Sequence, residues 1–186
     1  MRIVGGRNKG RSLKAPKGQA TRPTSDRARE SVFNILNARL EGGFEGLTVV
    51  DLFAGTGAYG LEALSRGAAQ AVLVDNNREA IKIIEENVVT LGETNRAILQ
   101  KRDATELGSL PHKASPADLV FLDPPYGLNL VEPALKSLLE NHWLAEKAIC
   151  IVEMSAKELI ELPDLFEQID QRKYGKAVIH ILRYSG

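Results

Sequence analysis

The chain has 186 residues, of which 44% are hydrophobic and 26% charged, with formal net charge zero. This composition is typical of one soluble globular core with at most a small appendage. No apolar stretch approaches the ~18 residues that span a bilayer, the start lacks the apolar core of a secretory signal, and a single cysteine excludes an internal disulfide framework. The three histidines are scattered, without metal-ligand spacing. We expect a cytoplasmic, metal-free monomer.

The zero net charge conceals an uneven distribution. Residues 1–39 contain ten Lys/Arg against two acids, so this segment carries +8 and the remainder −8. A basic segment on an acidic body is typical of proteins that contact a phosphate backbone. The alternative is a loosely ordered, solvated terminus, but the spacing favours two short strands, 2–6 and 9–13, around a turn. The expected nucleic-acid contacts are Arg2, Arg7, Lys9, Arg11, Arg22, Arg27 and Arg29.

An amphipathic helix follows this basic stretch. The polar run 22–30 leads into apolar residues at helical spacing, among them Val32, Phe33 and Leu36. Gly42-Gly43 then marks the junction with the rest of the chain. These features predict a hairpin-and-helix arm over residues 1–43 and a core domain over residues 44–186.

From Leu47 onward, short apolar runs alternate with amphipathic segments. Such alternation is typical of a mostly parallel sheet covered by helices on both faces. The last two strands have only a turn around Gly175 between them, so they should form an antiparallel hairpin. The predicted strands are 47–51, 71–75, 97–100, 117–122, 148–153, 166–173 and 176–184, and the predicted helices are 59–66, 78–91 and 130–141.

A glycine loop follows the first core strand, and residues 55–60 (GTGAYG) match the G-x-G-x-x-G spacing of dinucleotide-binding folds. Asp75, at the end of the next strand, fits the acid that binds a ribose in such folds. Asp51, however, ends the strand directly before the loop, where its carboxylate repels a pyrophosphate. The same carboxylate suits a ligand with an ammonium and a sulfonium group and no phosphate. The charge therefore favours S-adenosylmethionine over NAD.

Two further strands end on carboxylates that could bind this cofactor. Asp75 is expected to accept the ribose hydroxyls, and Asp103 to lie near the adenine amino group. For Asp75 the alternative is a helix N-cap or an ordinary loop acid. For Asp103 the alternative is the frequent occurrence of Asp at strand ends.

The run 117–122 ends at Asp123-Pro124-Pro125-Tyr126. Each proline lacks a backbone N–H and disfavours helix in the residue before it, so the segment is a stiff loop. The loop offers two acceptors, the Asp123 carboxylate and the Pro124 carbonyl, beside a ring suited to stacking on a planar ligand. This combination suits an exocyclic amino group of a nucleobase. The alternative is a strand that simply ends at a helix-breaking proline pair.

The order of these motifs resembles that of S-adenosylmethionine-dependent amino-methyltransferases, with DLFAGTG at 51–57 and DPPY at 123–126 on successive strand ends. The segment RPTSDRARESVF at 22–33, the opening MRIVGG and the closing KYG are similar to the RsmD family, which methylates a guanine N2 of bacterial 16S ribosomal RNA. The similarity covers essentially the whole chain. Tyr59 departs from the Leu common in relatives. Asn77 departs from an acidic pattern, which leaves the ribose contact open.

The resemblance implies a class I, Rossmann-like methyltransferase fold with a basic RNA-contacting arm packed on it. It implies S-adenosylmethionine as cofactor, S-adenosylhomocysteine as product and 16S ribosomal RNA as partner, either free, in the small subunit or in an assembly intermediate. The implied catalytic residues are Asp123 and Pro124, which accept the two amine hydrogens, and Tyr126, which stacks on the base. The implied cofactor contacts are Asp51, Phe53, Ala54, Gly55, Thr56, Gly57, Asp75, Asn76, Asp103 and Ala104.

Three other functions remain open. DNA adenine-N6 or cytosine-N4 methyltransferases use the same acceptor loop, but they generally need a target-recognition region, and no segment here is long enough. A NAD-dependent oxidoreductase fits the glycine spacing but not Asp51, and the chain lacks a Tyr-x-x-x-Lys or a suitable His. A non-catalytic RNA-binding module predicts that Asp123→Ala leaves function unchanged. Arg22 and Arg27 either contact RNA or fold back to support the site.

Overall fold

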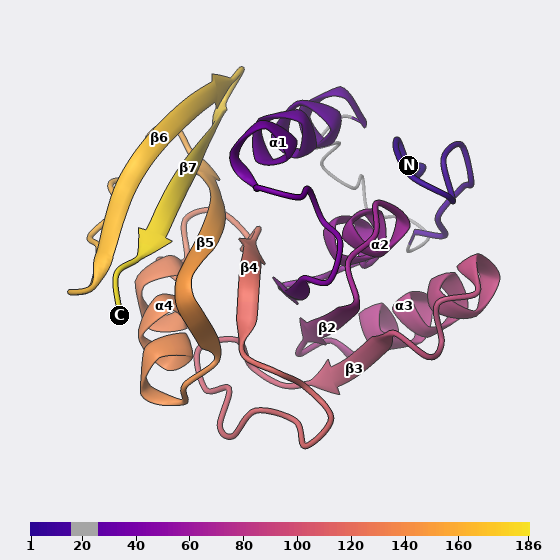
Figure 1. Cartoon of the computed structure of the whole chain (residues 1–186). Coiled ribbons are helices and arrows are strands. Elements are labelled where there is room, and N and C mark those ends of the chain that lie inside the picture. Colours follow the sequence, from indigo (N-terminus) through magenta and orange to yellow (C-terminus); the bar gives the residue numbers. More distant parts are fainter. Residues whose placement is uncertain (16–25) are drawn as a thin grey trace.

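The computed structural model describes residues 1–15 and 26–186, which form a seven-stranded sheet flanked by helices (Figure 1). The strand order is β3-β2-β1-β4-β5-β7-β6. Strands β1 to β5 are parallel, and β7 is antiparallel to both neighbours, β5 and β6. The predicted parallel sheet with a closing antiparallel hairpin is therefore confirmed. The elements are α1 (Asp26–Arg39), β1 (Thr48–Leu52), α2 (Ala58–Ser65), β2 (Gln70–Asp75), α3 (Arg78–Leu91), β3 (Ala97–Lys101), β4 (Ala117–Leu122), α4 (Val131–Glu140), β5 (Leu144–Ser155), β6 (Phe166–Tyr174) and β7 (Ala177–Tyr184).

Helices cover both faces of the sheet because its central strands are apolar on both sides. Val49 and Leu73 share one core with α1, α2 and α3, whereas their neighbours Val50 and Val72 share the other with α4. Cys150 is fully buried in this second core, and burial raises the pKa of its thiol to about 12. It is therefore a core residue, as predicted. No helix in the described part of the chain is long and apolar enough to cross a membrane.

Predicted and observed boundaries differ most at β5. The apolar pattern predicts 148–153, whereas the strand covers Leu144–Ser155. Its first residue pairs with Ala117 of β4, and the register shifts before Leu119. Lys147 lies in β5 between Leu144 and Ile149, which is the partner of Leu119, and has a φ of 61°. The exposed pair Glu146-Lys147 interrupts the apolar run, so the pattern begins only after it.

The N-terminal segment forms a narrow hairpin. Arg2 and Ser12 make an antiparallel bridge, and the Ile3 N–H donates to the Arg11 carbonyl at 3.0 Å. Ile3 and Leu13 are buried in the same core as α1, α2 and α3. The sequence predicts two short strands, 2–6 and 9–13, around a turn; the structure has the turn, but the pairing is limited to this one bridge. The apolar side chains attach the hairpin to the body.

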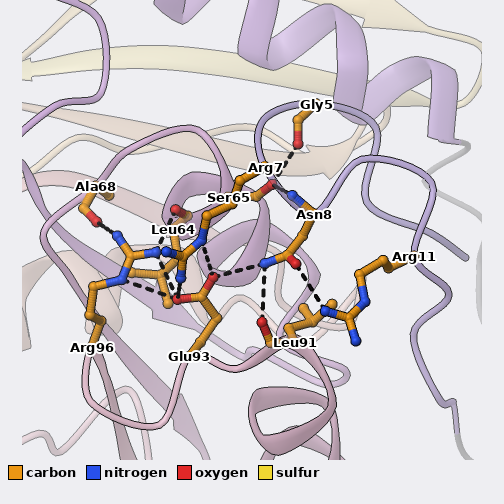
Figure 2. A network of polar contacts seen from close by, with 10 residues as sticks. All are labelled: Gly5, Arg7, Asn8, Arg11, Leu64, Ser65, Ala68, Leu91, Glu93 and Arg96. Atoms are coloured by element: carbon orange, nitrogen blue, oxygen red, sulfur yellow. Dashed lines mark hydrogen bonds and ion pairs between the residues drawn. The ribbon is translucent and has the colours of Figure 1, made fainter.

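A buried carboxylate binds this hairpin to the body (Figure 2). The Glu93 side chain has no exposed surface, and it accepts hydrogen bonds from Arg7, Asn8 and Arg96. Arg96 also donates to the carbonyls of Ala68 and Leu64. Burying a carboxylate is costly unless hydrogen bonds compensate the lost water, and here cations from two separate segments supply them.

Candidate active site

Four acidic residues lie at one edge of the sheet. Asp51, Asp75, Asp103 and Asp123 belong to, or follow within two residues, the parallel neighbours β1, β2, β3 and β4. Open α/β sheets bind ligands at this edge, outside the carboxyl ends of the strands. Burial raises the pKa of Asp51 well above its usual range, and the charges of Asp123 and Asp75 raise it further. Three of these carboxylates are therefore within electrostatic reach of one another, which suits a cationic ligand.

The Asp51 carboxylate also occupies the amino end of α2. Its Oδ2 accepts from the Gly60 N–H at 2.9 Å, and Gly60 is the third residue of the helix. A Cβ at Gly60 would lie 2.6 Å from Leu73 Cδ2, so the glycine allows α2 to approach the sheet closely. Dinucleotide folds leave this helix end open to a pyrophosphate. Here the Asp51 carboxylate accepts a hydrogen bond from this helix end, which disfavours the binding of NAD.

The loop between β1 and α2 turns sharply through left-handed residues. Phe53, Gly55 and Gly57 have φ angles of 58°, 57° and 77°. A Cβ at Gly57 would lie 3.2–3.4 Å from three core side chains, whereas one at Gly55 would meet only the Phe53 carbonyl, at 3.9 Å. The Thr56 hydroxyl points to the Met1 sulfur, at 3.2 Å, and Ala54 is buried. The Thr56 side chain is thus engaged with the hairpin, and its backbone is what the loop could offer a cofactor.

Asp75 holds two loops together at the end of β2. Its carboxylate accepts from the Gly55 N–H and the Asn77 N–H, both at 2.8 Å. The N-cap of α3 is Asn77, whose Oδ1 accepts from the Glu79 N–H at 2.8 Å, so Asp75 is not the helix cap. An ionised carboxylate has about four lone-pair sites, which leaves acceptor capacity for a ribose. Asn76 is exposed beside it.

Asp103 lies at the end of β3 with its side chain exposed. Its Oδ1 accepts from the Thr105 N–H at 2.9 Å and the Thr105 hydroxyl at 2.7 Å. These hydrogen bonds hold the pKa of Asp103 below its usual range, so the carboxylate is a charged acceptor at neutral pH. The next residue, Ala104, is buried in the second core.

The acceptor loop begins directly after β4. Asp123 is half-buried, Pro124 is buried and Pro125 is exposed. Tyr126 is half-buried, and its hydroxyl donates to Glu153 Oε1 at 3.0 Å. The loop therefore brings a carboxylate, a carbonyl and a fixed aromatic ring to the edge where Asp51 and Asp75 lie.

The sequence interpretation missed Glu153, a buried carboxylate at the end of β5. Leu122 of β4 pairs with Val152 of β5, so the residues that follow, Asp123 and Glu153, are register neighbours. The signal was available in the sequence, because Glu153 ends an apolar run as Asp123 does.

Tyr59 is the second residue that sequence reasoning did not assign to the site. Its ring stacks on Phe121 with centroids 4.7 Å apart, and its hydroxyl lies 3.5 Å from Glu153 Oε2. Burial raises the pKa of Tyr59 well above its usual range, and the charges of Glu153 and Asp123 raise it further. Tyr59 therefore remains a neutral hydroxyl donor behind the Tyr126–Glu153 pair.

Most basic side chains of the hairpin contact the protein itself. Arg2 lies 3.4 Å from Asp26, Arg7 pairs with Glu93, and Arg11 donates to the Thr90 carbonyl. Lys9 is exposed. An RNA contact from these four remains a prediction, and the charge available for it is smaller than the sequence count suggests. Arg22 lies outside the described residues.

Arg29 requires a correction. Its side chain is 1% exposed and donates to Asp26 and to the Arg2 carbonyl. Its Nε also lies 3.9 Å from Oε2 of the buried Glu62. A guanidinium enclosed in this way cannot reach an RNA phosphate, so the prediction of a direct contact is wrong for this residue. Its role is to connect α1, the hairpin and α2.

Two cavities flank the Tyr126–Glu153 pair. One, of about 310 Å³, has the acceptor loop on one side and the acids Glu132, Glu158 and Glu161 around it. The other, of about 1160 Å³, extends from the start of α1 to the β6–β7 turn. The site therefore opens on an acidic side and on a larger side whose lining is basic.

Comparisons with known proteins point to one family. The family model described as Conserved hypothetical protein 95 matches residues 1–183. A Bacillus subtilis protein, YlbH, provisionally named an rRNA methyltransferase, is 39% identical over all of both chains. Ribosomal RNA small subunit methyltransferase D of Escherichia coli is 38% identical over 82% of this chain and 74% of its own. A solved Escherichia coli structure, yhhF, provisionally titled a methyltransferase, superposes with a TM-score of 0.84 at 32% identity, over 100% and 98% of the chains.

Proposed function

The chain belongs to the Conserved hypothetical protein 95 family of RsmD-like methyltransferases, and on that premise we propose that it methylates the exocyclic N2 of a guanine in 16S ribosomal RNA. The observation that carries the proposal is the placement of the Asp123–Tyr126 loop beside the acid cluster of β1 and β2. An amine acceptor and a site for a cationic cofactor then share one sheet edge. The relatives named as ribosomal RNA methyltransferases support RNA as the substrate.

The residues at this edge fit S-adenosylmethionine. The buried acid on the α2 amino end and the open space at Gly55 suit a ligand without phosphates. Asp51 would lie near the ammonium group, Asp75 would accept the ribose hydroxyls, and Asp103 would lie near the adenine. When bound, S-adenosylmethionine supplies a methyl group made electrophilic by its sulfonium.

The acceptor loop would activate the amine. The lone pair of guanine N2 is delocalised into the ring, so attack requires the nitrogen to pyramidalise and gain positive charge. Asp123 and the Pro124 carbonyl, accepting its two hydrogens, stabilise that charge and aim the lone pair. As the methyl group is transferred, the nitrogen would release one proton to an Asp123 oxygen or to water, and the sulfur would keep the electron pair of its broken bond. Tyr126 stacks on the extruded base, which contributes ~1–3 kcal/mol.

Methyl transfer to nucleic acids from a strain lacking the protein tests this function. Purified protein, tritiated S-adenosylmethionine and separate total RNA and DNA substrates are incubated, and the products are digested to nucleosides. We expect label in 16S ribosomal RNA as N2-methylguanosine. Label in DNA would instead support the alternative of a DNA adenine-N6 or cytosine-N4 methyltransferase. Tighter binding of NAD than of S-adenosylmethionine would refute the cofactor assignment.

The raised pKa of Asp51 makes cofactor binding depend on pH. Without a ligand, burial raises the pKa of Asp51 well above its usual range. A nearby ammonium group, by contrast, favours the ionised carboxylate. Binding should therefore release a proton, and affinity should increase with pH until the raised pKa is passed. In the same window the ligand-free fold should lose stability as pH rises, since only the unfolded chain ionises freely.

Calorimetric titration of S-adenosylmethionine over a pH series, in two buffers with different heats of ionisation, measures both the affinity and the protons released. Asp51→Asn serves as the control: its affinity should be weak and nearly independent of pH. Proton uptake on binding, or an affinity that falls with pH, would contradict the assignment.

The Tyr126–Glu153 hydrogen bond should contribute to turnover by fixing the stacking ring. Tyr126→Phe keeps the ring and removes the hydroxyl, and Glu153→Gln removes the charge that the hydroxyl faces. Each change should lower kcat by about tenfold, in line with hydrogen bonds to charged groups. The double variant should be little worse than either single one, because both remove the same interaction.

Single-turnover rates and KM values for the four proteins of this cycle measure the coupling. Tyr126→Ala gives the reference for losing the stacking surface altogether, and it should be the slowest variant. If the effects of Tyr126→Phe and Glu153→Gln multiply in the double variant, the two residues act independently and Glu153 does not position the ring.

A further inference from the structure

The larger cavity beside Tyr126 is a groove with a charged rim. Its exposed basic residues come from three separate segments: the start of α1, the residues after β5 and the tip of the β6–β7 hairpin. Tyr126 and Glu153 line its inner end. We call it the basic groove. Its rim cations are Arg27, Lys157, Lys173 and Lys176.

These cations differ from those of the N-terminal hairpin. In residues 1–15 and 26–186, none of the four rim cations forms an ion pair. Residues 16–25 contain no Asp or Glu that could neutralise them. In the hairpin, by contrast, Arg7 and Lys14 pair with Glu93 and Glu86 of the body, as Figure 2 shows for Arg7. Within the described residues, the groove therefore gathers four cations without an ion pair beside Tyr126.

The groove is held in shape by contacts between its walls. The Tyr174 hydroxyl and the Ser31 hydroxyl lie 2.6 Å apart, which connects the hairpin of β6 and β7 to α1. The Ala156 N–H donates to the Lys176 carbonyl at 2.9 Å, which connects the same turn to the end of β5. Figure 1 shows the tip of this hairpin beside α1. A rim with fixed walls presents its charges in a constant geometry, which reduces the ordering cost of binding.

The distribution of charge indicates how a ligand would lie in the groove. The cations are at the rim, whereas the buried carboxylate Glu153 is at the inner end beside the Tyr126 ring. A phosphate is attracted to the rim and repelled from the inner end. An uncharged aromatic base suits the inner end, where a ring is available for stacking.

We propose that the basic groove binds the RNA strand on either side of the target nucleotide, with Lys157, Lys173 and Lys176 as phosphate contacts. The inference rests on the proposed function, and it assigns the docking of the substrate to the carboxyl-terminal hairpin and the end of β5. The strand lies along the rim, and the target base leaves it toward Tyr126. Arg27 contacts the same backbone from the α1 side.

The salt dependence of RNA binding tests the groove. A triple variant, Lys157→Ala/Lys173→Ala/Lys176→Ala, is titrated with unmodified, transcribed 16S ribosomal RNA over about 50–200 mM salt. Each neutralised phosphate of a single strand contributes about 0.7 to the slope of log K against log salt, so the slope should become shallower by about 2. The corresponding Lys→Arg triple should keep the native slope, because it keeps the charge.

The matched control removes three exposed lysines elsewhere. Lys82→Ala/Lys113→Ala/Lys147→Ala makes the same change in net charge on α3, before β4 and near the start of β5. Its slope should equal that of the native chain. An unchanged slope in the groove triple variant would overturn the inference and would favour an acidic protein as the partner that binds the groove. An equal change of slope in both triple variants would overturn it as well.

Failure of the groove and failure of the function give different results. If the groove triple keeps the native slope while the native chain still forms N2-methylguanosine, the groove assignment is wrong and the proposed function stands. If the slope changes as expected while no substrate is methylated, RNA docking in the groove stands and the proposed function is wrong. Thermal unfolding of each variant verifies that the exposed substitutions leave the fold intact.

Discussion

Asparagine in place of Asp123 is expected to lower the rate of methyl transfer at saturating substrates by about 100- to 1,000-fold, comparable to removing one group that stabilises transition-state charge. The amide keeps the size of the carboxylate but has no negative charge. Its NH2 group can also face the guanine amino group, from which Asp123 would accept a hydrogen bond. RNA affinity should stay within about twofold, because the cations proposed to bind the RNA backbone lie on the groove rim and are unchanged. Single-turnover methyl transfer and filter binding measure the two quantities.

Asp164→Asn is the matched control for this experiment. Asp164 is exposed in the connection between β5 and β6, so the variant makes the same chemical change away from the sheet edge. Its methyl-transfer rate should equal that of the native chain. A native methyl-transfer rate for Asp123→Asn would refute the acceptor mechanism. RNA binding by the native chain without any methyl transfer would favour a non-catalytic RNA-binding module.

Replacing Glu93 by alanine should lower the free energy of unfolding by about 3 kcal/mol, because it removes one partner of a buried charged network. The side chain is fully buried and accepts from Arg7, Asn8 and Arg96. Without it, Arg96 and the amide of Asn8 lose their charged acceptor, and the hairpin loses one of its polar attachments to the body. Chemical denaturation at constant pH measures the change.

Glu85→Ala provides the control, since Glu85 is exposed on α3 and forms no ion pair in the described part of the chain. It should change stability by less than about 0.5 kcal/mol. Glu93→Gln should lie between the two, because the amide can still accept a hydrogen bond but also presents two donors to the arginines. Equal stabilities for Glu93→Ala and Glu85→Ala would show that the network contributes nothing net.

The core strands and the acids at their ends could be predicted because their signals are local. Apolar runs such as 117–122 identify buried strands by themselves, and the parallel arrangement then brings Asp51 and Asp123 to one edge. The start of β5 was missed because two exposed charges interrupt its pattern. Glu153 was missed because its role depends on register with β4, which no single strand encodes.

The basic residues were the least predictable part of the site. Their number in residues 1–39 was plain, but whether a cation is free depends on partners distant in sequence. Arg7 finds its partner 86 residues away, at Glu93. Conversely, Lys157, Lys173 and Lys176 lie in a region of net negative charge, and only the fold brings them to one rim with Arg27.

The sequence by itself determined the alternation of strands and helices, the glycine loop and the acceptor loop, because backbone propensity and apolar periodicity act over a few residues. It also determined which acids end the strands. Only the tertiary structure decided which charges are neutralised, which side chain holds Tyr126, and where free positive charge faces a ligand. Those properties depend on distances between residues far apart in the chain. Burial and ion pairing, which the fold creates, alter the energy of a charged group far more than the adjacent residues in the sequence do.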